Sequence, residues 1–326
     1  MTEQDEIWAL FNALYTDIQN ADIIFERKPL LAHYTSIQTI EKIIKDEEIW
    51  FSNPLCMNDT EELRFGLNTG MRLFTQSNVV DEIIGKQKAD DARQKLTDCY
   101  MEYNKTHAIK VYVFCLSEHR PDDNDGKLSM WRAYGSGGNG AAIVFNTEPI
   151  FKWEDSPLII AKVDYATREE RKKKLGQLIQ KWCSIVADNH IAEDKFWIAP
   201  ASLFNAFTLF ALTWKHSGFK EEQEWRVIYM PERDRKGILK DKMSYVIGSR
   251  GVEPKLKLNI APLPGSPSPS PISLASLLDR IILGPCVSSD LAISSFHVML
   301  NQIKPEFPEF VDKVFASTIP LRPTQG

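Results

Sequence analysis

The feature that most restricts the fold is an acidic turn that runs directly into an apolar, β-rich segment. The turn is Glu221-Glu222-Gln223-Glu224, and Trp225-Arg226-Val227-Ile228-Tyr229 follows it. Because successive side chains of a strand point to opposite faces, Glu222, Glu224 and Arg226 are predicted to share one face, opposite the aromatic residues. A carboxylate at the start of a strand is costly to bury unless it has a partner or a task. The segment therefore predicts a core strand that begins at a polar constellation.

Short β-rich runs of this kind alternate with helical patterns of varied length, and this order favours an α+β fold with a mixed, mainly antiparallel sheet. We expect an N-terminal helix within residues 1–29 and a single domain over 30–326, with a helical insertion at about 167–215. The predicted strands are 30–34, 49–52, 111–117, 141–145, 158–165, 225–229, 256–260 and 277–284. The predicted helices are 6–25, 37–44, 79–105, 167–190, 195–215 and 290–303.

Bulk composition narrows the classes of protein to consider. The 326 residues are 43% hydrophobic and 25% charged, which is typical of a globular protein with a full core. A net charge of -5 argues against a dedicated duplex-DNA binder, which usually carries a strongly basic domain. We find no apolar run that approaches the roughly 20 residues of a membrane-spanning helix, and the N-terminus lacks the basic start of a signal peptide. These two observations favour a protein without membrane association. The 5 cysteines are scattered, without a CxxC pair, which favours a reducing cytoplasm.

A second polar constellation lies far upstream, on the predicted strand 30–34. His33 is followed by the hydroxyl-bearing Tyr34, Thr35 and Ser36, and such a set can hydrogen-bond a sugar or an amide. The structural alternative is a core histidine followed by a helix cap, since Thr35 or Ser36 can cap the next helix. Both interpretations stay open at this point.

The carboxylates of the later constellation also fit two descriptions. Glu224 beside a ribose can hold its 2′-hydroxyl and stabilise a developing oxocarbenium ion through its charge. Glu222, on the same face, can orient or deprotonate an incoming nucleophile. The alternatives are a solvated acidic turn, or an ion pair between Glu224 and either Arg226 or Arg132.

An aromatic segment, a glycine-rich segment and an acidic segment complete the candidates. Trp131 and Arg132 can stack a base or ring, or they can form a packed corner. The glycines within 135–140 match no phosphate-binding fingerprint, and we expect a mobile loop there. Asn58-Asp59-Thr60-Glu61-Glu62 carries acids that could hold a divalent metal, but an N-cap followed by acids in the first helical turn explains it better.

The basic run 168–174 can contact phosphates, but such a run is more often the solvated face of a helix. We therefore predict no metal site, and a local basic patch that contacts nucleic acid stays open as the alternative.

Six motifs in this order resemble the bacterial family called domain of unknown function 2971, over most of the chain from about residue 30. They are His33-Tyr34-Thr35-Ser36, Trp50-Phe51-Ser52-Asn53-Pro54 with Asn58-Asp59 and Glu61, Phe114-Cys115-Leu116-Ser117, Met130-Trp131-Arg132-Ala133-Tyr134, Glu222-Gln223-Glu224-Trp225-Arg226, and Ile281-Ile282-Leu283-Gly284.

A more distant resemblance, to the ADP-ribosyltransferase superfamily, implies more. A strand bearing His-x-Thr, a helix with an Ile-Ile pair, a short strand and a late Glu that opens an apolar strand are similar to that superfamily, whose members bind NAD between two small sheets. The resemblance implies a split sheet, with NAD contacted by His33, Tyr34, Thr35, Ser52, Asn58, Trp131 and Arg132. It assigns Glu224 as the catalytic acid and Glu222 as its partner. The middle position, at Ser52 or Tyr34, departs from the family pattern.

Three functions follow as hypotheses. The first is an NAD-dependent mono-ADP-ribosyltransferase, or NAD glycohydrolase, acting on a protein or nucleic-acid acceptor. The resemblance implies a bacterial toxin or phage-defence setting for it, with an antitoxin or another regulatory protein as a partner. The second is a non-catalytic module that binds a nucleotide or a partner protein. The third is a metal-dependent nuclease that uses Asp59, Glu61 and Glu62.

Overall fold

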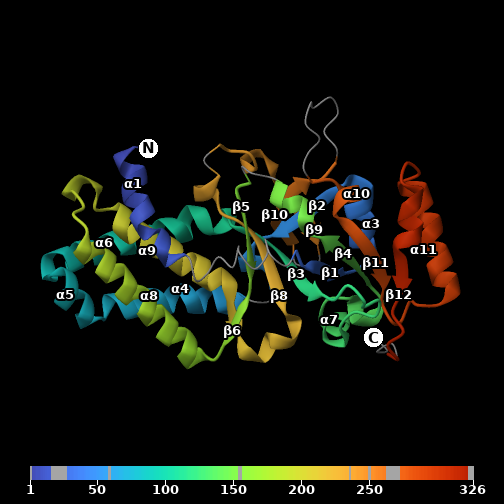
Figure 1. Cartoon of the computed structure of the whole chain (residues 1–326), viewed down its shortest axis with the longest axis horizontal. Helices are drawn as coiled ribbons and strands as arrows, with labels where there is room; N and C mark the ends of the chain where they lie inside the picture. The colour runs from blue at the N-terminus through green and yellow to red at the C-terminus, as the bar shows by residue number, and fades with distance from the viewer. Residues whose placement is uncertain are drawn as a thin grey trace.

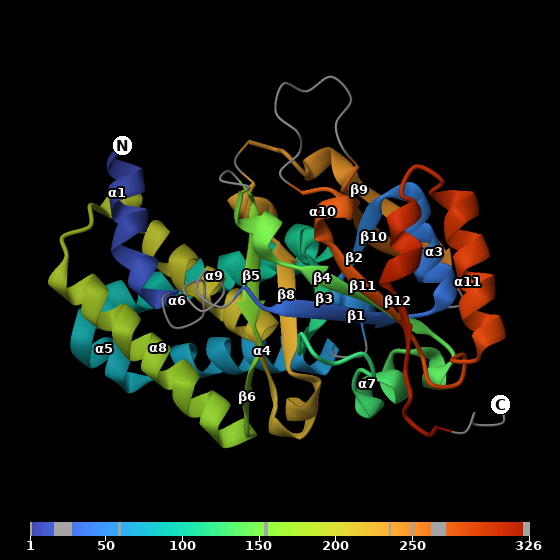
Figure 2. The ribbon, with the colours of Figure 1, turned by 45° about the vertical axis from the view of Figure 1, so that its right-hand side comes forward.

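The structure is a computed structural model, and it describes residues 2–15, 28–57, 60–152, 156–234, 236–248, 251–261 and 272–321. One end of the molecule is built from helices and the rest from a large sheet with helices against it (Figure 1). The helical end contains α1, α4, α5, α6, α8 and α9, and α11 lies at the opposite end (Figure 2).

The helices largely follow the predicted pattern. Ser36 caps the helix after the first strand, and Thr167 forms a reciprocal capping box with Glu170 at the start of the longest helix. The predicted helix 79–105 is divided at Gly85, and the first helix ends at Leu10, before a 3-10 turn at Phe11–Leu14. Residues 16–25 of that predicted helix lie outside the described residues. The bounds are α1 Glu3–Leu10, α3 Ile37–Asp46, α4 Thr60–Thr75, α5 Asn78–Ile84, α6 Lys86–Glu102, α7 Leu128–Ala133, α8 Arg168–Asp188, α9 Ile198–Thr213, α10 Leu274–Leu277 and α11 Asp290–Ile303.

The main sheet has 10 strands and is mixed but mostly antiparallel, as predicted. Its path is β12-β11-β4-β1-β3-β2-β10-β9, and β8 and then β5 branch from β3. Within it, only the pair β11–β12 is parallel among the described strands; β6 and β7 form a separate parallel pair. The strands are β1 Leu30–Thr35, β2 Glu48–Ser52, β3 Tyr112–His119, β4 Ala141–Asn146, β5 Leu158–Lys162, β6 Asp164–Ala166, β7 Trp214–His216, β8 Glu224–Tyr229, β9 Met243–Gly248, β10 Gly251–Asn259, β11 Leu278–Leu283 and β12 Val314–Ala316.

The sheet divides at β3. One edge of β3 pairs with β8 along Tyr112–Ser117. Its other edge is shared, because β1 pairs with Ser117–His119 and β2 pairs only through Ser52 and Val113. Cys115 lies between these two contacts and pairs on that edge with none of the described strands. Two groups of strands, β12-β11-β4-β1 and β2-β10-β9, therefore separate at Cys115.

The two faces of β3 belong to different cores. Val113 and Cys115 pack with the helical core of α4, α6, α8 and α9. Tyr112, Phe114 and Leu116 pack into a second core beneath α3, α10 and α11. This separation follows from the alternation of side chains along a strand.

Helix α9 belongs to a long apolar segment whose length the sequence analysis underestimated. Residues Glu193–Thr213 are long and apolar enough, by length and composition, to cross a membrane, with a mean hydropathy of 1.4 in their most apolar window. The expectation that no run approaches this length is therefore wrong. However, 83% of that window is buried inside the fold, as expected for the central helix of a core surrounded by other helices.

Candidate functional site

A network of charged side chains lies on the Cys115 face of β3, where β8 begins. Glu224 is 5% exposed, and its carboxylate accepts hydrogen bonds from Arg226 Nε at 2.8 Å and Arg226 Nη2 at 3.1 Å. Lys215 Nζ, on β7, donates to the same carboxylate at 3.3 Å. Burial alone would raise the pKa of Glu224, but the Arg226 guanidinium and the Lys215 ammonium outweigh it and lower that pKa to about 2. Glu224 is thus a buried, fully paired carboxylate.

Glu222 is the more accessible of the two acids. It ends the 3-10 segment η8 (Ser217–Glu222) rather than lying on the strand, and Gln223, with φ 44°, turns the chain into β8. Lys215, 1% exposed, joins the acids by donating to Glu222 Oε2 at 2.7 Å. Tyr134, an exposed residue, donates to Glu222 Oε1 at 3.1 Å. The shared face predicted for Glu224 and Arg226 is confirmed, whereas Glu222 joins them through Lys215.

Lys127 extends this network toward β1. Its Nζ donates to Ser117 Oγ at 2.9 Å and approaches the Glu222 carbonyl oxygen at 3.5 Å, and its amide donates to the Tyr34 hydroxyl at 3.0 Å. Lys127 forms no ion pair with a carboxylate in the described part of the chain. Burial lowers the pKa of this half-buried lysine to about 8, although Glu118 and Asp123 act in the opposite direction.

Ser117 is close to Lys127, but it is fully buried. Its hydroxyl donates to the Glu222 carbonyl oxygen at 2.5 Å. A hydroxyl that is sealed in this way cannot reach a substrate, so the pair does not form a nucleophilic Ser-Lys dyad in this conformation.

His33 lies on the opposite face of β3 from Glu224. Its ring packs on Phe114, with 4.5 Å between the ring centroids, and Phe114 belongs to the second core. Its Nδ1 bonds to the Cys115 carbonyl oxygen at 2.9 Å, at the point where β1 and β2 separate from β3. A carbonyl only accepts, so Nδ1 carries the proton, and burial lowers the pKa of His33 so that the ring stays neutral. The structure does not bring His33 and Glu224 into one cleft.

Tyr34 and Trp131 form a packed corner. Trp131 is fully buried, its indole nitrogen donates to the Asp125 carbonyl oxygen at 2.8 Å, and its ring meets Tyr34 edge-on at 4.7 Å between centroids. A Cβ added at Gly126 would lie 2.8 Å from the Tyr34 hydroxyl oxygen, and Gly126 has φ 72°, so glycine is required in this turn. The stacking role predicted for Trp131 does not fit its complete burial. Arg132 is exposed, and no hydrogen bond or ion pair connects it to the network.

The glycine-rich segment is a loop with a 3-10 turn at Ser136–Gly138, and it packs closely against the sheet. Gly140 donates its amide to the Gly135 carbonyl oxygen at 2.9 Å, and Gly284 donates to the Gly140 carbonyl oxygen at 2.9 Å. A Cβ at Gly140 would lie 2.2 Å from the Thr35 carbonyl oxygen. The glycines therefore permit close backbone contact rather than looseness. Thr35 itself is half-buried and pairs with Ala141 in the ladder.

Ser52 and the acidic segment 58–62 remain from the predicted site. Ser52 is half-buried opposite Val113 on the face of the charged network, and its Oγ accepts from Lys255 Nζ at 2.9 Å. Asn58 and Asp59 lie outside the described residues, and the side chains of Glu61 and Glu62 are not described. Among the residues that the structure does describe, no three His, Cys, Asp or Glu side chains are grouped to hold a metal ion. All five cysteines are free.

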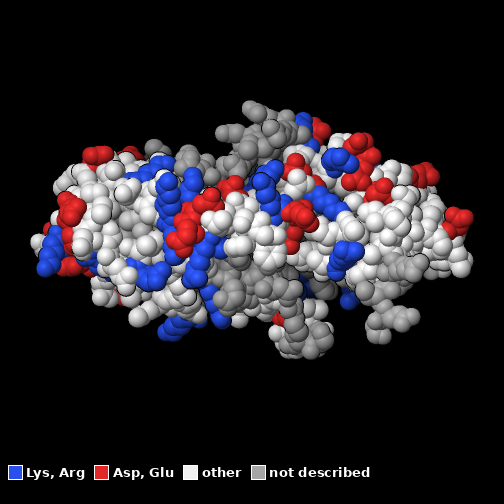
Figure 3. Space-filling view, turned by 90° about the horizontal axis from the view of Figure 1, so that it is seen from below, with Lys and Arg blue, Asp and Glu red and all other residues white. Residues whose placement is uncertain are grey.

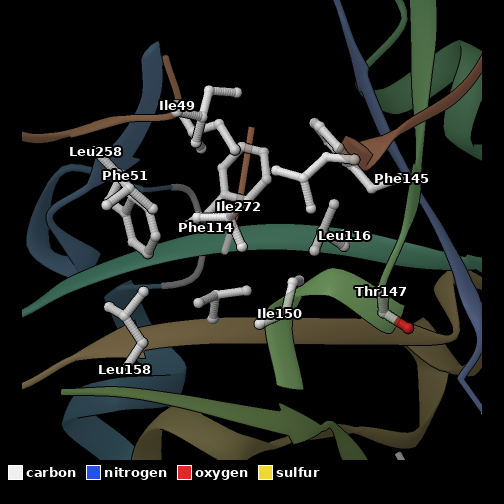
Figure 4. Close-up of a pocket in the computed structure, with 13 residues that line it drawn as sticks. Ile49, Phe51, Phe114, Leu116, Phe145, Thr147, Ile150, Leu158, Leu258 and Ile272 are labelled. Carbon is white, nitrogen blue, oxygen red and sulfur yellow. The ribbon is translucent and has the colours of Figure 1, made fainter. Parts of the chain in front are cut away.

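The Phe114 face carries an apolar cavity of about 40 Å³ (Figure 4). Phe114 and Leu116 of β3, Phe51 of β2 and Phe145 of β4 contribute to its lining. Its single polar side chain is Thr147, whose hydroxyl donates to the Pro29 carbonyl oxygen at 2.8 Å. The lining therefore offers no free polar group, and the cavity suits neither a nucleotide nor water.

Seen from below, Lys and Arg side chains are interspersed with Asp and Glu, without a continuous basic surface (Figure 3). The basic residues within 168–174 are interrupted by Glu169 and Glu170, and Lys172 forms an ion pair with Glu169. This mixture is typical of the solvated helix face that the sequence predicted.

Sequence reasoning missed Lys127, Lys215, Ser117 and Tyr134 as members of the network. Lys215 follows a long apolar helix, and its position between Glu222 and Glu224 depends on the return of the chain through η8. Lys127 ends a loop rich in Asp, Asn and Gly. Neither lysine has a local motif that identifies it.

Comparison with known proteins adds one match. A family model described as "Protein of unknown function (DUF2971)" matches residues 130–227. No curated protein and no solved structure matches the chain. The matched stretch contains Tyr134, Lys215, Glu222, Glu224 and Arg226 of the charged network, while His33, Ser52, Ser117 and Lys127 lie outside it. Over residues 130–227, the chain matches this family of unknown function, in agreement with the resemblance drawn from its motifs.

Proposed function

We propose that the charged network on the Cys115 face of β3 binds an anionic ligand, and that this ligand is the phosphate group of a nucleotide. The chain is then a nucleotide-binding module. The observation that supports this proposal is Lys127, a half-buried ammonium without a carboxylate partner. A buried cation that lacks a counter-ion is costly, and a bound phosphate would supply one through a charge-assisted hydrogen bond.

The neighbours of Lys127 favour an anion over other ligands. Two of its Nζ contacts go to neutral oxygens, those of Ser117 and the Glu222 main chain. An ammonium has three donors, so at least one remains for a ligand. Lys215 and Arg226 lie behind Glu222 and Glu224 and balance their charge. Glu118 and Asp123 favour the charged form of Lys127 from a distance, but neither forms an ion pair with it in the described part of the chain.

Binding of NAD and ATP by the full chain tests this proposal. We expect either nucleotide to raise the unfolding temperature, and calorimetry to show that Lys127→Met weakens binding by about 10- to 100-fold, the value of one hydrogen bond to a charged group. Lys105→Met, at an exposed position, is the matched control and should bind as the wild type does. Equal affinity of Lys127→Met and wild type would remove the proposal.

The pH dependence offers a second test with NAD, whose diphosphate does not titrate near neutrality. Because the pKa of Lys127 is lowered to about 8, the lysine is charged below that pH and neutral above it. Affinity should therefore fall by about tenfold between pH 7 and pH 9. Lys127→Arg keeps its charge throughout this range and should bind with little dependence on pH.

ADP-ribosyl transfer from NAD is a second candidate, and a specific observation favours Glu222 as its acid. The Glu222 side chain is 12% exposed, and it contacts the exposed Tyr134. In this reaction the bond between the ribose and nicotinamide breaks, its electron pair leaves with nicotinamide, and an acceptor nucleophile loses its proton as it bonds to the sugar. A carboxylate near the ribose would stabilise the cationic sugar.

Release of nicotinamide from labelled NAD in the presence of a cell lysate tests this candidate. Glu222→Gln should abolish the release while the protein stays folded, with a smaller loss of stability than Glu224→Gln shows. Glu221→Gln, at the exposed neighbouring position, should retain the release. Absence of release by wild type and both variants, together with normal NAD binding, would leave the binding module as the function.

A further inference from the structure

The hairpin of β9 and β10 carries an apolar stripe that continues out of the core. The facing pairs are Leu256 with Met243, Pro254 with Tyr245, and Val252 with Ile247. Alternate positions of a strand share a face, so these six side chains form one row. Leu256 is buried in the second core, but Tyr245 is 63% exposed, Ile247 73% and Val252 68%.

The outer edge of β9 is also unpaired in the described part of the chain. β9 ends the path of the sheet and pairs only with β10. Every second residue of an edge strand turns its amide and carbonyl outward, and proteins usually protect such an edge with charges, proline or a bulge. Met243–Gly248 has the sequence MSYVIG and contains none of these. Exposed apolar side chains and free backbone groups therefore coincide on one strand, and together they specify a β-strand as the partner.

We propose that two copies of this chain associate through antiparallel pairing of β9 with β9, with a two-fold axis at Val246. In this register, Tyr245 of each copy faces Ile247 of the other, and Ser244 faces Gly248. The exposed side chains then form aromatic and β-branched cross-strand pairs, which favour association, while the small residues meet on the other face. The strand is its own complement, and no charge is repeated across the axis.

The same hairpin also sets the strength of the interaction. A ladder over Ser244–Gly248, with three exposed apolar side chains per copy, buries less than the roughly 1,200–2,000 Å² of a standard stable interface. The dimer is therefore reversible, and it forms with rising protein concentration. This association is independent of nucleotide binding at Lys127, which lies at the N-cap of α7 and not on the β9–β10 hairpin.

Sedimentation equilibrium of the full chain over a wide concentration range tests the proposal. The average mass should rise from that of one chain toward that of two, and Ile247→Lys should keep the mass of one chain at every concentration. Leu291→Lys, on α11, is the matched control because Leu291 is an equally exposed apolar residue at 77%, and it should behave as wild type. A wild type that stays monomeric, or an Ile247→Lys variant that still dimerises, would overturn the proposal.

Cross-linking then checks the register. Val246→Cys places two thiols across the proposed axis, and mild oxidation should give a covalent dimer on a non-reducing gel. Ser244→Cys faces Gly248 instead and should give little dimer. Both variants carry the same five native cysteines, so those cysteines contribute equally to the background. Efficient cross-linking of Ser244→Cys but not Val246→Cys would contradict the proposed pairing.

Discussion

The two faces of β3 differ in chemistry although their residues alternate along one strand of eight residues. On one face, Cys115 and Ser117 meet Glu224, Arg226 and Lys127 in a network of charged hydrogen bonds. On the other face, Phe114 and Leu116 line an apolar cavity. The alternation of side chains along one strand therefore places a charged network on one face and an apolar cavity on the other. The two faces contribute differently to the stability of the fold.

The costs are unequal. Desolvating the Glu224 carboxylate is offset only because Arg226 and Lys215 both reach it, and removal of one partner from a buried ion pair is strongly destabilising. A cavity of about 40 Å³ costs only the contacts that its lining lacks. The polar face should therefore respond to substitution far more than the apolar face.

The largest expected effect follows from Glu224→Gln. Two buried cations then lose a counter-ion, and the free energy of unfolding in urea should fall by about 3–5 kcal/mol. Glu222→Gln should cost clearly less, because its carboxylate is partly exposed to water. A loss below about 1 kcal/mol for Glu224→Gln would mean that the ion pairs on this face contribute little.

The same carboxylate predicts a dependence of stability on pH. Its folded-state pKa is lowered to about 2, so its contribution is fully present above the ordinary glutamate value and is lost as the pH falls toward 2. Wild-type stability should therefore decrease over this acid range more steeply than that of Glu224→Gln. Parallel curves for the two proteins would contradict the assignment of Glu224 as the paired acid.

A smaller effect is expected at the division of the sheet. His33→Phe removes the donor to the Cys115 carbonyl oxygen, and an unpaired buried carbonyl costs about 1–3 kcal/mol of unfolding free energy. His33→Asn, whose amide can take the place of Nδ1, should restore part of this loss. If both variants are as stable as wild type but bind NAD poorly, His33 contacts ligand rather than supporting the sheet.

One pair of substitutions compares the two faces directly. Val227→Ile adds a methylene beside the cavity and should stabilise the protein by about 0.5–1 kcal/mol. Val113→Ile, on the opposite face, enlarges a side chain that is already closely packed and should destabilise it by about 1–3 kcal/mol. Urea unfolding measures both, and equal changes of the same sign would show that the cavity does not distinguish the faces.

The sequence predicted the elements better than the site. Alternation in Trp225–Tyr229 correctly predicted β8, and Ser36 correctly predicted the start of α3, because both signals are local. The opposite placement of His33 and Glu224 was not predictable from either strand. It depends on which face of β3, a third strand, each of the two residues lies over, and this is set by how β1 and β8 pair with β3. Lys127 and Lys215 enter the network through turns whose direction is set by tertiary packing.

Titration of Lys127 by NMR, with and without NAD, tests the central claim most directly. The account predicts that the Cε signal of Lys127, identified by its loss in Lys127→Met, titrates near pH 8 in the free protein. Addition of NAD should raise that pKa, because a bound phosphate favours the charged amine. A lysine that titrates at its ordinary value of about 10.4 and does not respond to NAD would contradict it.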